Sequence, residues 1–221
     1  MNIYIVLAPI LAYLIGSVPT GYWLSKAWKG IDIRQQGSGS TGATNVWRCV
    51  GKGAGITVFL VDLFKGYLPV WAVLQWNVDQ TQILPVVMGA AALFGHSKSI
   101  FLEFQGGKSA ATGLGTLLAL QPFVGLLTFV TWLIIVLIGR IVSLASILAV
   151  FCCIFFMALL HAPTTYVAYC VLGFLYVTYR HKSNIKRLLN HTEPRLGEKP
   201  VINPDERKGV PVVGDSGEVQ G

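Results

Sequence analysis

Two long apolar runs constrain this chain more than any other feature. They read GLLTFVTWLIIVLIG, over residues 125–139, and VSLASILAVFCCIFFMALL, over residues 142–160. Helices of this length can cross the hydrocarbon core of a bilayer, whereas a soluble domain would expose much of their surface to water. Charged residues make up 12% of the chain, about half their usual share in soluble domains. The sequence therefore predicts an all-α integral membrane protein.

Apolar segments alternate with polar connections along most of the chain. The apolar segments cover residues 3–25, 54–76, 83–95, 112–139, 141–161 and 163–179. No Lys or Arg precedes the first segment, so it lacks the basic region of a signal peptide, and we expect it to remain as a membrane span.

The positions of charges and cysteines argue against two classes of protein. The net charge of +7 could suggest a nucleic-acid-binding protein, but the bases lie next to apolar segments, which is the pattern that orients membrane proteins. We expect no nucleic-acid partner. The cysteines Cys49, Cys152, Cys153 and Cys170 lack metal-ligand spacing, so we expect no metal site.

Basic residues concentrate in the polar stretches 26–53, 96–111 and 180–221. Next to the apolar segments these bases are Lys26, Lys29, Arg34, Arg48, Lys52, Lys98, Lys108, Arg180, Lys182, Lys186 and Arg187. The connection at residues 77–82 holds Asp79 and no base. Because cytoplasmic loops carry the excess of Lys and Arg, we expect these stretches to face the cytoplasm and the N-terminus to lie outside.

This orientation requires an even number of crossings between the second polar stretch and the C-terminal one, yet hydropathy shows three segments there. The long segment 112–139 contains Gln121-Pro122, and proline disfavours helix in the residue before it. A break there gives seven transmembrane helices, some of them short, with the C-terminus in the cytoplasm. A re-entrant hairpin is the alternative.

We expect one multi-span membrane domain over residues 1–196. The segment 197–221 is rich in Gly, Pro and charged residues and poor in aromatic residues. Such a composition favours a disordered cytoplasmic tail.

The first polar stretch contains GSGSTGATNVWR, over residues 37–48. Glycines allow left-handed turns whose N–H groups can bind an anion, and a short helix beginning near Ala43 would add further N–H donors, with Arg48 one turn later. The segment lacks the Gly-Lys-Ser/Thr ending of a nucleotide-binding loop. A phosphate site and a flexible linker both remain open from these residues alone.

The second stretch contains GHSKSIFLEFQGGKSAAT, over residues 95–112. Gly106 and Gly107 offer flexible backbone before the ammonium of Lys108, at the start of a predicted helix, so a second phosphate could bind there. Alternatively, Lys108 is an interfacial lysine that reaches toward water. His96 is more often a structural residue than a base in such a context.

The third stretch contains YRHKSNIKRLL, over residues 179–189. On a helix, His181 and Asn184 share a face and could bind one hydroxyl group. Lys186 and Arg187 are typical of a helix beside anionic lipid headgroups. Elsewhere, Asp62 and Lys65 are expected to form a structural ion pair, and Ser143 and Ser146 are expected to cap a helix.

These three motifs, in this order, resemble those of the bacterial acyl-phosphate:glycerol-3-phosphate acyltransferase family (PlsY type). VDLFKG and RIVSLAS match that family as well, and the resemblance extends from AYLIGSVPTGYWLSK to NIKRLLNHTEPRLGEK. The family usually has Asn where this chain has Ser40 and more often has Val where it has Ala110, and the tail beyond Lys199 is longer than typical.

The resemblance implies transfer of an acyl group from acyl phosphate to the 1-hydroxyl of glycerol 3-phosphate, giving lysophosphatidic acid and phosphate. It implies no cofactor, a multi-pass protein of the bacterial inner membrane in contact with membrane lipid, and a cytoplasmic active site. We expect a monomer. The candidate catalytic residues are Ser38, Arg48, Lys108, His181 and Asn184. The candidate substrate- and phosphate-binding residues are Gly37, Gly39, Ser40, Ala43, Thr44, Asn45, His96, Gly106, Gly107 and Ser146.

No histidine is followed by an aspartate at the fifth position, so the His-x4-Asp pair of soluble acyltransferases is absent. We therefore expect Arg48 and Lys108 to stabilise developing negative charge. The alcohol proton would pass to His181 or to a substrate phosphate. A transporter of anionic solutes and a non-catalytic lipid-binding protein are the other classes considered. A transporter more often carries its ionisable groups at the bilayer midplane.

Overall fold

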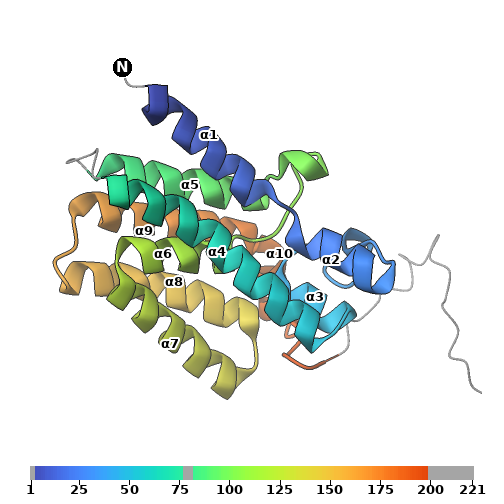
Figure 1. The fold of residues 1–221 in the computed structure, drawn as a ribbon. Coiled ribbons are helices and arrows are strands. Elements are labelled where there is room, and N and C mark those ends of the chain that lie inside the picture. Colours follow the sequence, from blue (N-terminus) through green and yellow to red (C-terminus); the bar gives the residue numbers. More distant parts are fainter. Residues whose placement is uncertain (1–2, 77–81, 199–221) are drawn as a thin grey trace, which may run out of the picture.

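A computed structural model describes residues 3–76 and 82–198, and its regular structure is helical within these ranges (Figure 1). The α-helices are α1 (Ile3–Ser17), α2 (Thr20–Lys29), α3 (Ala43–Cys49), α4 (Lys52–Trp76), α5 (Ile83–Ser97), α6 (Ala110–Leu120), α7 (Pro122–Gly139), α8 (Val142–Leu159), α9 (Thr164–Arg180) and α10 (Lys182–Leu189). Two short 3-10 helices, η1 (Ile33–Gln35) and η2 (Ile100–Leu102), lie in the connections. Asp79 and the predicted disordered tail beyond Glu198 lie outside the described residues.

Four helical segments are long and apolar enough to cross a membrane by length and composition: Ile5–Lys29, Lys52–Trp76, Pro122–Gly139 and Val142–Leu159. Helices α5 and α6 are apolar but shorter. The expectation of an all-helical chain with several apolar helices is confirmed in the described residues. The number of spans and their orientation stay predictions.

The predicted break before Pro122 is confirmed. Helix α6 ends at Leu120, Gln121 is extended, and Pro122 is the first residue of α7. Proline suits this position because its missing N–H would have no partner in the first turn of a helix.

The first apolar segment is also broken, which the sequence analysis did not predict. Helix α1 ends at Ser17 and α2 begins at Thr20, with Val18 and Pro19 between them. The carbonyl of Val18 accepts a hydrogen bond from Lys65 Nζ at 2.8 Å. A buried side chain of α4 thus satisfies a backbone group that the break leaves without a helical partner.

Helix pairs pack closely where glycines remove the side chain. Helix α1 packs on α5, α4 on α6, and α7 on α8, with α4 and α6 in the middle of the bundle (Figure 1). A Cβ at Gly66 of α4 would lie 2.0 Å from Thr112 O, and one at Gly115 of α6 would lie 1.9 Å from Leu63 O. The α4–α6 contact therefore depends on glycine on both sides, as in other membrane helix pairs.

The connections that carry the bases gather at one end of the bundle, where α2, α3 and α10 lie (Figure 1). Arg140, after α7, also lies there. Leu196 N donates to Arg140 O at 2.6 Å, and Arg140 Nη2 donates to Leu196 O at 2.9 Å. If all of these connections face the cytoplasm, they must lie at the same end of the bundle, as they do here.

Candidate active site

The three glycine-rich or basic motifs and helix α8 enclose a cavity of about 130 Å³ at this end of the bundle. All five candidate catalytic residues line it: Ser38, Arg48, Lys108, His181 and Asn184. Of the candidate binding residues, Ser40, Ala43, Thr44, Asn45, His96 and Ser146 also line it. Gly37, Gly39, Gly106 and Gly107 do not. Segments far apart in the sequence thus meet at one site.

The first loop owes its shape to two glycines and one buried amide. Gly37 and Gly39 have φ angles of 57° and 68°, which favour glycine. The Asn45 side chain is buried. Its Oδ1 accepts from Ser38 N at 3.0 Å, and its Nδ2 donates to the carbonyls of Gln36 and Ser40, each at 2.9 Å. Asn45 therefore fixes the loop backbone, and both polar atoms of its side chain are used for this.

Ser40, the position that departs from the resembled family, accepts a hydrogen bond from Gly42 N at 3.3 Å. Its hydroxyl oxygen thus supports the turn that leads into α3, whose N-cap is Gly42. Serine commonly forms this kind of local turn.

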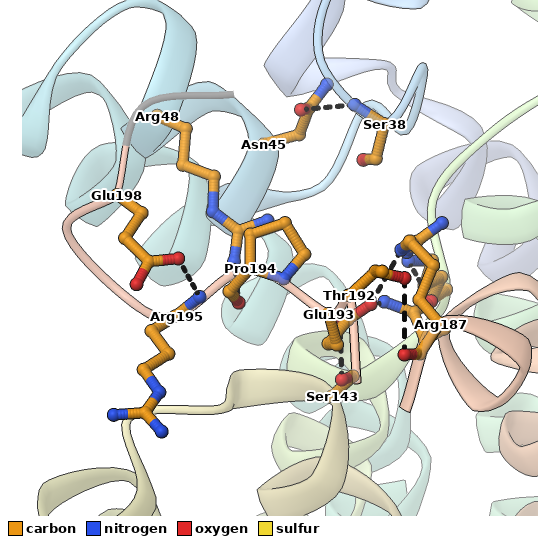
Figure 2. Close-up of polar contacts among 12 residues, drawn as sticks. Ser38, Asn45, Arg48, Ser143, Arg187, Thr192, Glu193, Pro194, Arg195 and Glu198 are labelled. Atoms are coloured by element: carbon orange, nitrogen blue, oxygen red, sulfur yellow. Dashed lines mark hydrogen bonds and ion pairs between the residues drawn. The ribbon is translucent and has the colours of Figure 1, made fainter. Parts of the chain in front are cut away.

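Arg48 projects from α3 toward the C-terminal segment (Figure 2). Its Nη2 donates to Pro194 O at 2.9 Å, while its buried Nε has no partner among the described residues. Burial lowers the pKa of the guanidinium and outweighs the charge of Glu193, which would raise that pKa. This cation therefore lies in a partly desolvated position without a carboxylate bonded to it, which favours binding of an anion.

Lys108 lies directly before the N-cap of α6, Ser109. Its Nζ donates to Asn184 Oδ1 at 2.5 Å. Burial, together with the positive charge of Arg187, lowers the pKa of Lys108 to about 8. An incoming phosphate would oppose both effects and stabilise the ammonium form.

His181 lies between α9 and α10 and is 4% exposed. Its Nδ1 lies 2.8 Å from Val177 O. Because a carbonyl can only accept, Nδ1 carries the hydrogen, and Nε2 of the neutral ring is unprotonated. Burial lowers the pKa of His181 to about 4. The imidazole is therefore neutral near pH 7 and offers an acceptor.

Glu193 was missed by the sequence analysis. It lines the cavity, and its Oε1 accepts from Ser143 Oγ at 2.7 Å and from Asn184 Nδ2 at 2.6 Å. Its Oε2 accepts from Arg187 Nε at 2.7 Å. Figure 2 shows this carboxylate with Ser143 and Arg187. Burial alone would raise the pKa of Glu193, but these hydrogen bonds outweigh it and lower that pKa.

The serines of α8 differ from the capping role expected of them. Ser143 Oγ donates to Glu193, and Ser146 Oγ donates to Val142 O at 2.9 Å within the helix. Ser146 also accepts from Trp132 Nε1 at 3.2 Å. The structure shows no side-chain cap at the start of α8, so the capping prediction is wrong.

Part of the cavity wall is apolar. It consists of side chains from α4, α6, α7 and α8: Phe59, Leu114, Leu117, Phe129, Trp132, Ala149 and Val150. The Trp132 ring stacks with the rings of Phe59 and Phe129. The sequence analysis named none of these residues, because apolar side chains that line a cavity have the same pattern as those that pack in a core. The cavity thus joins a cationic compartment to an apolar one.

His96 belongs to a second cluster, with the predicted Asp62–Lys65 pair. Lys65 Nζ and Asp62 Oδ1 lie 2.7 Å apart, with both side chains buried, which confirms that pair. His96 Nδ1 lies 3.4 Å from Lys65 Nζ. Gly106 and Gly107 pack against His96: a Cβ at Gly107 would lie 2.1 Å from His96 Nε2. Glycine is required at both positions because a Cβ atom would collide with His96.

Replacing Asn45 by Asp should distort the first loop. The new carboxylate cannot donate to the part-buried carbonyls that Nδ2 now binds. The Ser40 carbonyl would lose that donor and the Gln36 carbonyl would keep only Gly39 N, so the unfolding temperature in detergent should fall by about 5–10 °C. The control is Asn190→Asp at an exposed position. Equal unfolding temperatures for the two variants would contradict a structural role for the Asn45 amide.

Comparisons with known proteins show the family of this chain. The family model described as glycerol-3-phosphate acyltransferase matches residues 6–191. Over 199 residues the chain is 48% identical to a glycerol-3-phosphate acyltransferase of Rippkaea orientalis, covering 86% of this chain and 92% of that protein. It is 50% identical over 199 residues to a glycerol-3-phosphate acyltransferase of Crocosphaera subtropica, covering 86% of this chain and 93% of that protein.

Among solved structures, the chain is similar to the crystal structure of PlsY in its glycerol 3-phosphate form. That protein is described as an integral membrane glycerol 3-phosphate acyltransferase, and the TM-score is 0.82 at 39% identity, with 87% of this chain and 96% of that chain covered. The resemblance drawn from the motifs is therefore confirmed. This chain is a multi-pass membrane acyltransferase and belongs to the glycerol-3-phosphate acyltransferase family.

Proposed function

We propose that this protein transfers an acyl group from acyl phosphate to the 1-hydroxyl of glycerol 3-phosphate, releasing 1-acylglycerol 3-phosphate and inorganic phosphate. The observation that carries the proposal is the cavity that joins half-buried cations to an apolar compartment. An acyl phosphate has the same two parts, an anionic head and an apolar chain.

The cationic compartment suits phosphate groups. Arg48 and Lys108 line it, and both are partly desolvated. Glu193 also lines the cavity, but its carboxylate is already bonded to Ser143, Asn184 and Arg187. The cations are therefore available to phosphate oxygens, which arginine and lysine bind through charge-assisted hydrogen bonds.

The reaction needs little from the protein beyond orientation and charge. The C1 oxygen of glycerol 3-phosphate attacks the acyl carbonyl carbon, and the carbon–oxygen bond to phosphate then breaks, with its electron pair leaving on phosphate. Lys108 and Arg48 would stabilise the negative charge on the carbonyl oxygen and on the departing phosphate. Holding both substrates in one cavity supplies the favourable orientation.

The hydroxyl proton passes to His181 or to a substrate phosphate. The lowered pKa of His181, about 4, makes its ring a weaker base than a phosphate monoester, whose second pKa is about 6. We therefore favour the phosphate as the final proton acceptor. His181 Nε2 would accept a hydrogen bond from the hydroxyl and orient it for attack.

The direct test uses purified protein with acyl phosphate and glycerol 3-phosphate, without coenzyme A. We expect equimolar 1-acylglycerol 3-phosphate and phosphate, whereas acyl-coenzyme A in place of acyl phosphate should give little product. If only acyl-coenzyme A supports the reaction, or if no product forms in several lipids and detergents, the proposed donor is wrong.

Replacing His181 by Gln distinguishes the two proton acceptors. The glutamine oxygen can accept a hydrogen bond from the hydroxyl but cannot take its proton, so we expect kcat to fall by only about tenfold, less than the about 10²–10⁴-fold contribution of a general base. Steady-state kinetics with varied glycerol 3-phosphate provide the measurement. A loss above about 10³-fold with an unchanged unfolding temperature would identify His181 as an obligatory base.

We also propose that the domain over residues 1–196 spans the bacterial inner membrane seven times as a monomer, with the N-terminus outside and this cavity facing the cytoplasm. The common location of the basic connections supports this orientation. Labelling of single introduced cysteines with a membrane-impermeant reagent in intact cells and in inverted vesicles tests it.

A further inference from the structure

Arg180 does not line the cavity, yet it binds the loop that carries Lys108. It is the last residue of α9. Its Nη2 donates to Gly107 O at 2.9 Å and makes longer contacts with Ser97 O at 3.3 Å and Gly106 O at 3.4 Å. One guanidinium nitrogen therefore joins the end of α5 and the Gly106–Gly107 turn to α9.

The turn is held against α5 from its other side. Gly107 N donates to His96 O at 3.1 Å, and a Cβ at Gly106 would lie 2.3 Å from that same carbonyl oxygen. The backbone between α5 and Lys108 thus has little room to shift. The N–H of Gly107 and the Cα of Gly106 face His96 O, whereas the carbonyls of both glycines face Arg180.

A second side chain of α9 binds the same segment. Tyr176, one turn before Arg180, forms a hydrogen bond between its hydroxyl and that of Ser97. Side chains four residues apart lie on the same face of a helix. The end of α9 therefore holds the segment from Ser97 to Gly107 at two places.

These contacts lie beside the reacting groups. His181 follows Arg180 directly in the chain, and Asn184 of α10 accepts a hydrogen bond from Lys108 Nζ. A movement of the glycine turn away from α9 would move Lys108 away from Asn184 and His181. The backbone contact made by Arg180 is therefore placed to limit such a movement.

We propose that Arg180 is a positioning residue, which holds the Gly106–Gly107 turn so that the Lys108 ammonium stays next to His181 and Asn184. Arg180 acts through Lys108 and touches neither substrate. This inference rests on the proposed function of Lys108. The planar guanidinium presents donors in a fixed arrangement, so lysine should replace it only in part.

A double-mutant cycle in the full-length protein tests the proposal. Arg180→Gln should lower kcat/KM for glycerol 3-phosphate by about 10–100-fold, because a misplaced catalytic group costs this much. In a Lys108→Ala background the same change should cost less than about threefold, since residues that act as one unit are not additive. Arg180→Lys should restore part of the activity. The matched control is Lys182→Gln, which removes a neighbouring exposed positive charge and should leave kcat/KM unchanged.

Two results would overturn the inference. One is an equal loss from Arg180→Gln in both backgrounds, which would indicate a general structural role. The other is full activity of Arg180→Gln itself. If Arg180→Gln does not fold, as judged by thermal unfolding, the same cycle with Arg180→Lys decides between these outcomes. Full activity of Lys108→Ala alone would instead refute the proposed function of Lys108.

Discussion

Replacing Lys108 by Ala is expected to lower kcat/KM by about 10²–10³-fold, the usual effect of removing one group that stabilises developing charge. Its half-buried ammonium lines the cavity beside Asn184, where water screens it less than at the surface. The loss should appear in kcat as well as in KM, because the same charge stabilises the transition state and binds phosphate in the ground state. Initial rates at several concentrations of both substrates separate the two effects.

Lys98→Ala is the matched control, because Lys98 lies in the same connection but is exposed. It should retain kcat and KM close to those of the unmodified protein. If Lys108→Ala also retained them, the idea that this charge stabilises the transition state would have to be abandoned.

The pH dependence gives a second test of the Lys108 ammonium. Its pKa is lowered to about 8, so the charged form is complete below this pH and is lost as the pH rises through it. In the free enzyme kcat/KM should therefore decline above about pH 8, whereas bound phosphate should move the decline of kcat to higher pH. Lys108→Arg, if active, should remove the decline altogether, since arginine stays charged.

The helix breaks show what the sequence could and could not predict. A helix break precedes Pro122 as expected and another precedes α2 at Pro19 unexpectedly, yet Pro9 and Pro69 lie inside α1 and α4. Proline alone therefore does not determine a break. At Val18 the freed carbonyl accepts a hydrogen bond from Lys65, a residue of another helix. Such tertiary partners cannot be read from local sequence.

The sequence predicted which residues form the site better than it predicted the contacts between them. The motif residues Arg48, Lys108 and His181 do line one cavity. Asn45, however, uses its amide on the loop backbone, and Gly107 is packed against His96. Local sequence identifies glycines and polar groups, but whether they face a ligand or each other depends on contacts between distant segments.

Glu193 is the clearest example of such a distant contact, and its replacement by Ala should have the second large effect. Ser143, Asn184 and Arg187 would all lose an acceptor. Since hydrogen bonds to a charged group contribute about 1.5–3 kcal/mol each, we expect the unfolding temperature in detergent to fall by more than about 5 °C.

Activity should fall by about 10²-fold as well, because Asn184 would no longer be held and a 1 Å misplacement can cost this much. Asn184 Nδ2 now donates to Glu193, which directs Oδ1 toward Lys108 Nζ. Without the carboxylate the amide can rotate and present its NH₂ group to the ammonium, which repels it. Glu193→Gln keeps one acceptor and should be intermediate, whereas Glu198→Ala, at an exposed acidic position of the same segment, should change neither property. If Glu193→Ala matched Glu198→Ala in both unfolding temperature and kcat/KM, the carboxylate would have no part in orienting Asn184.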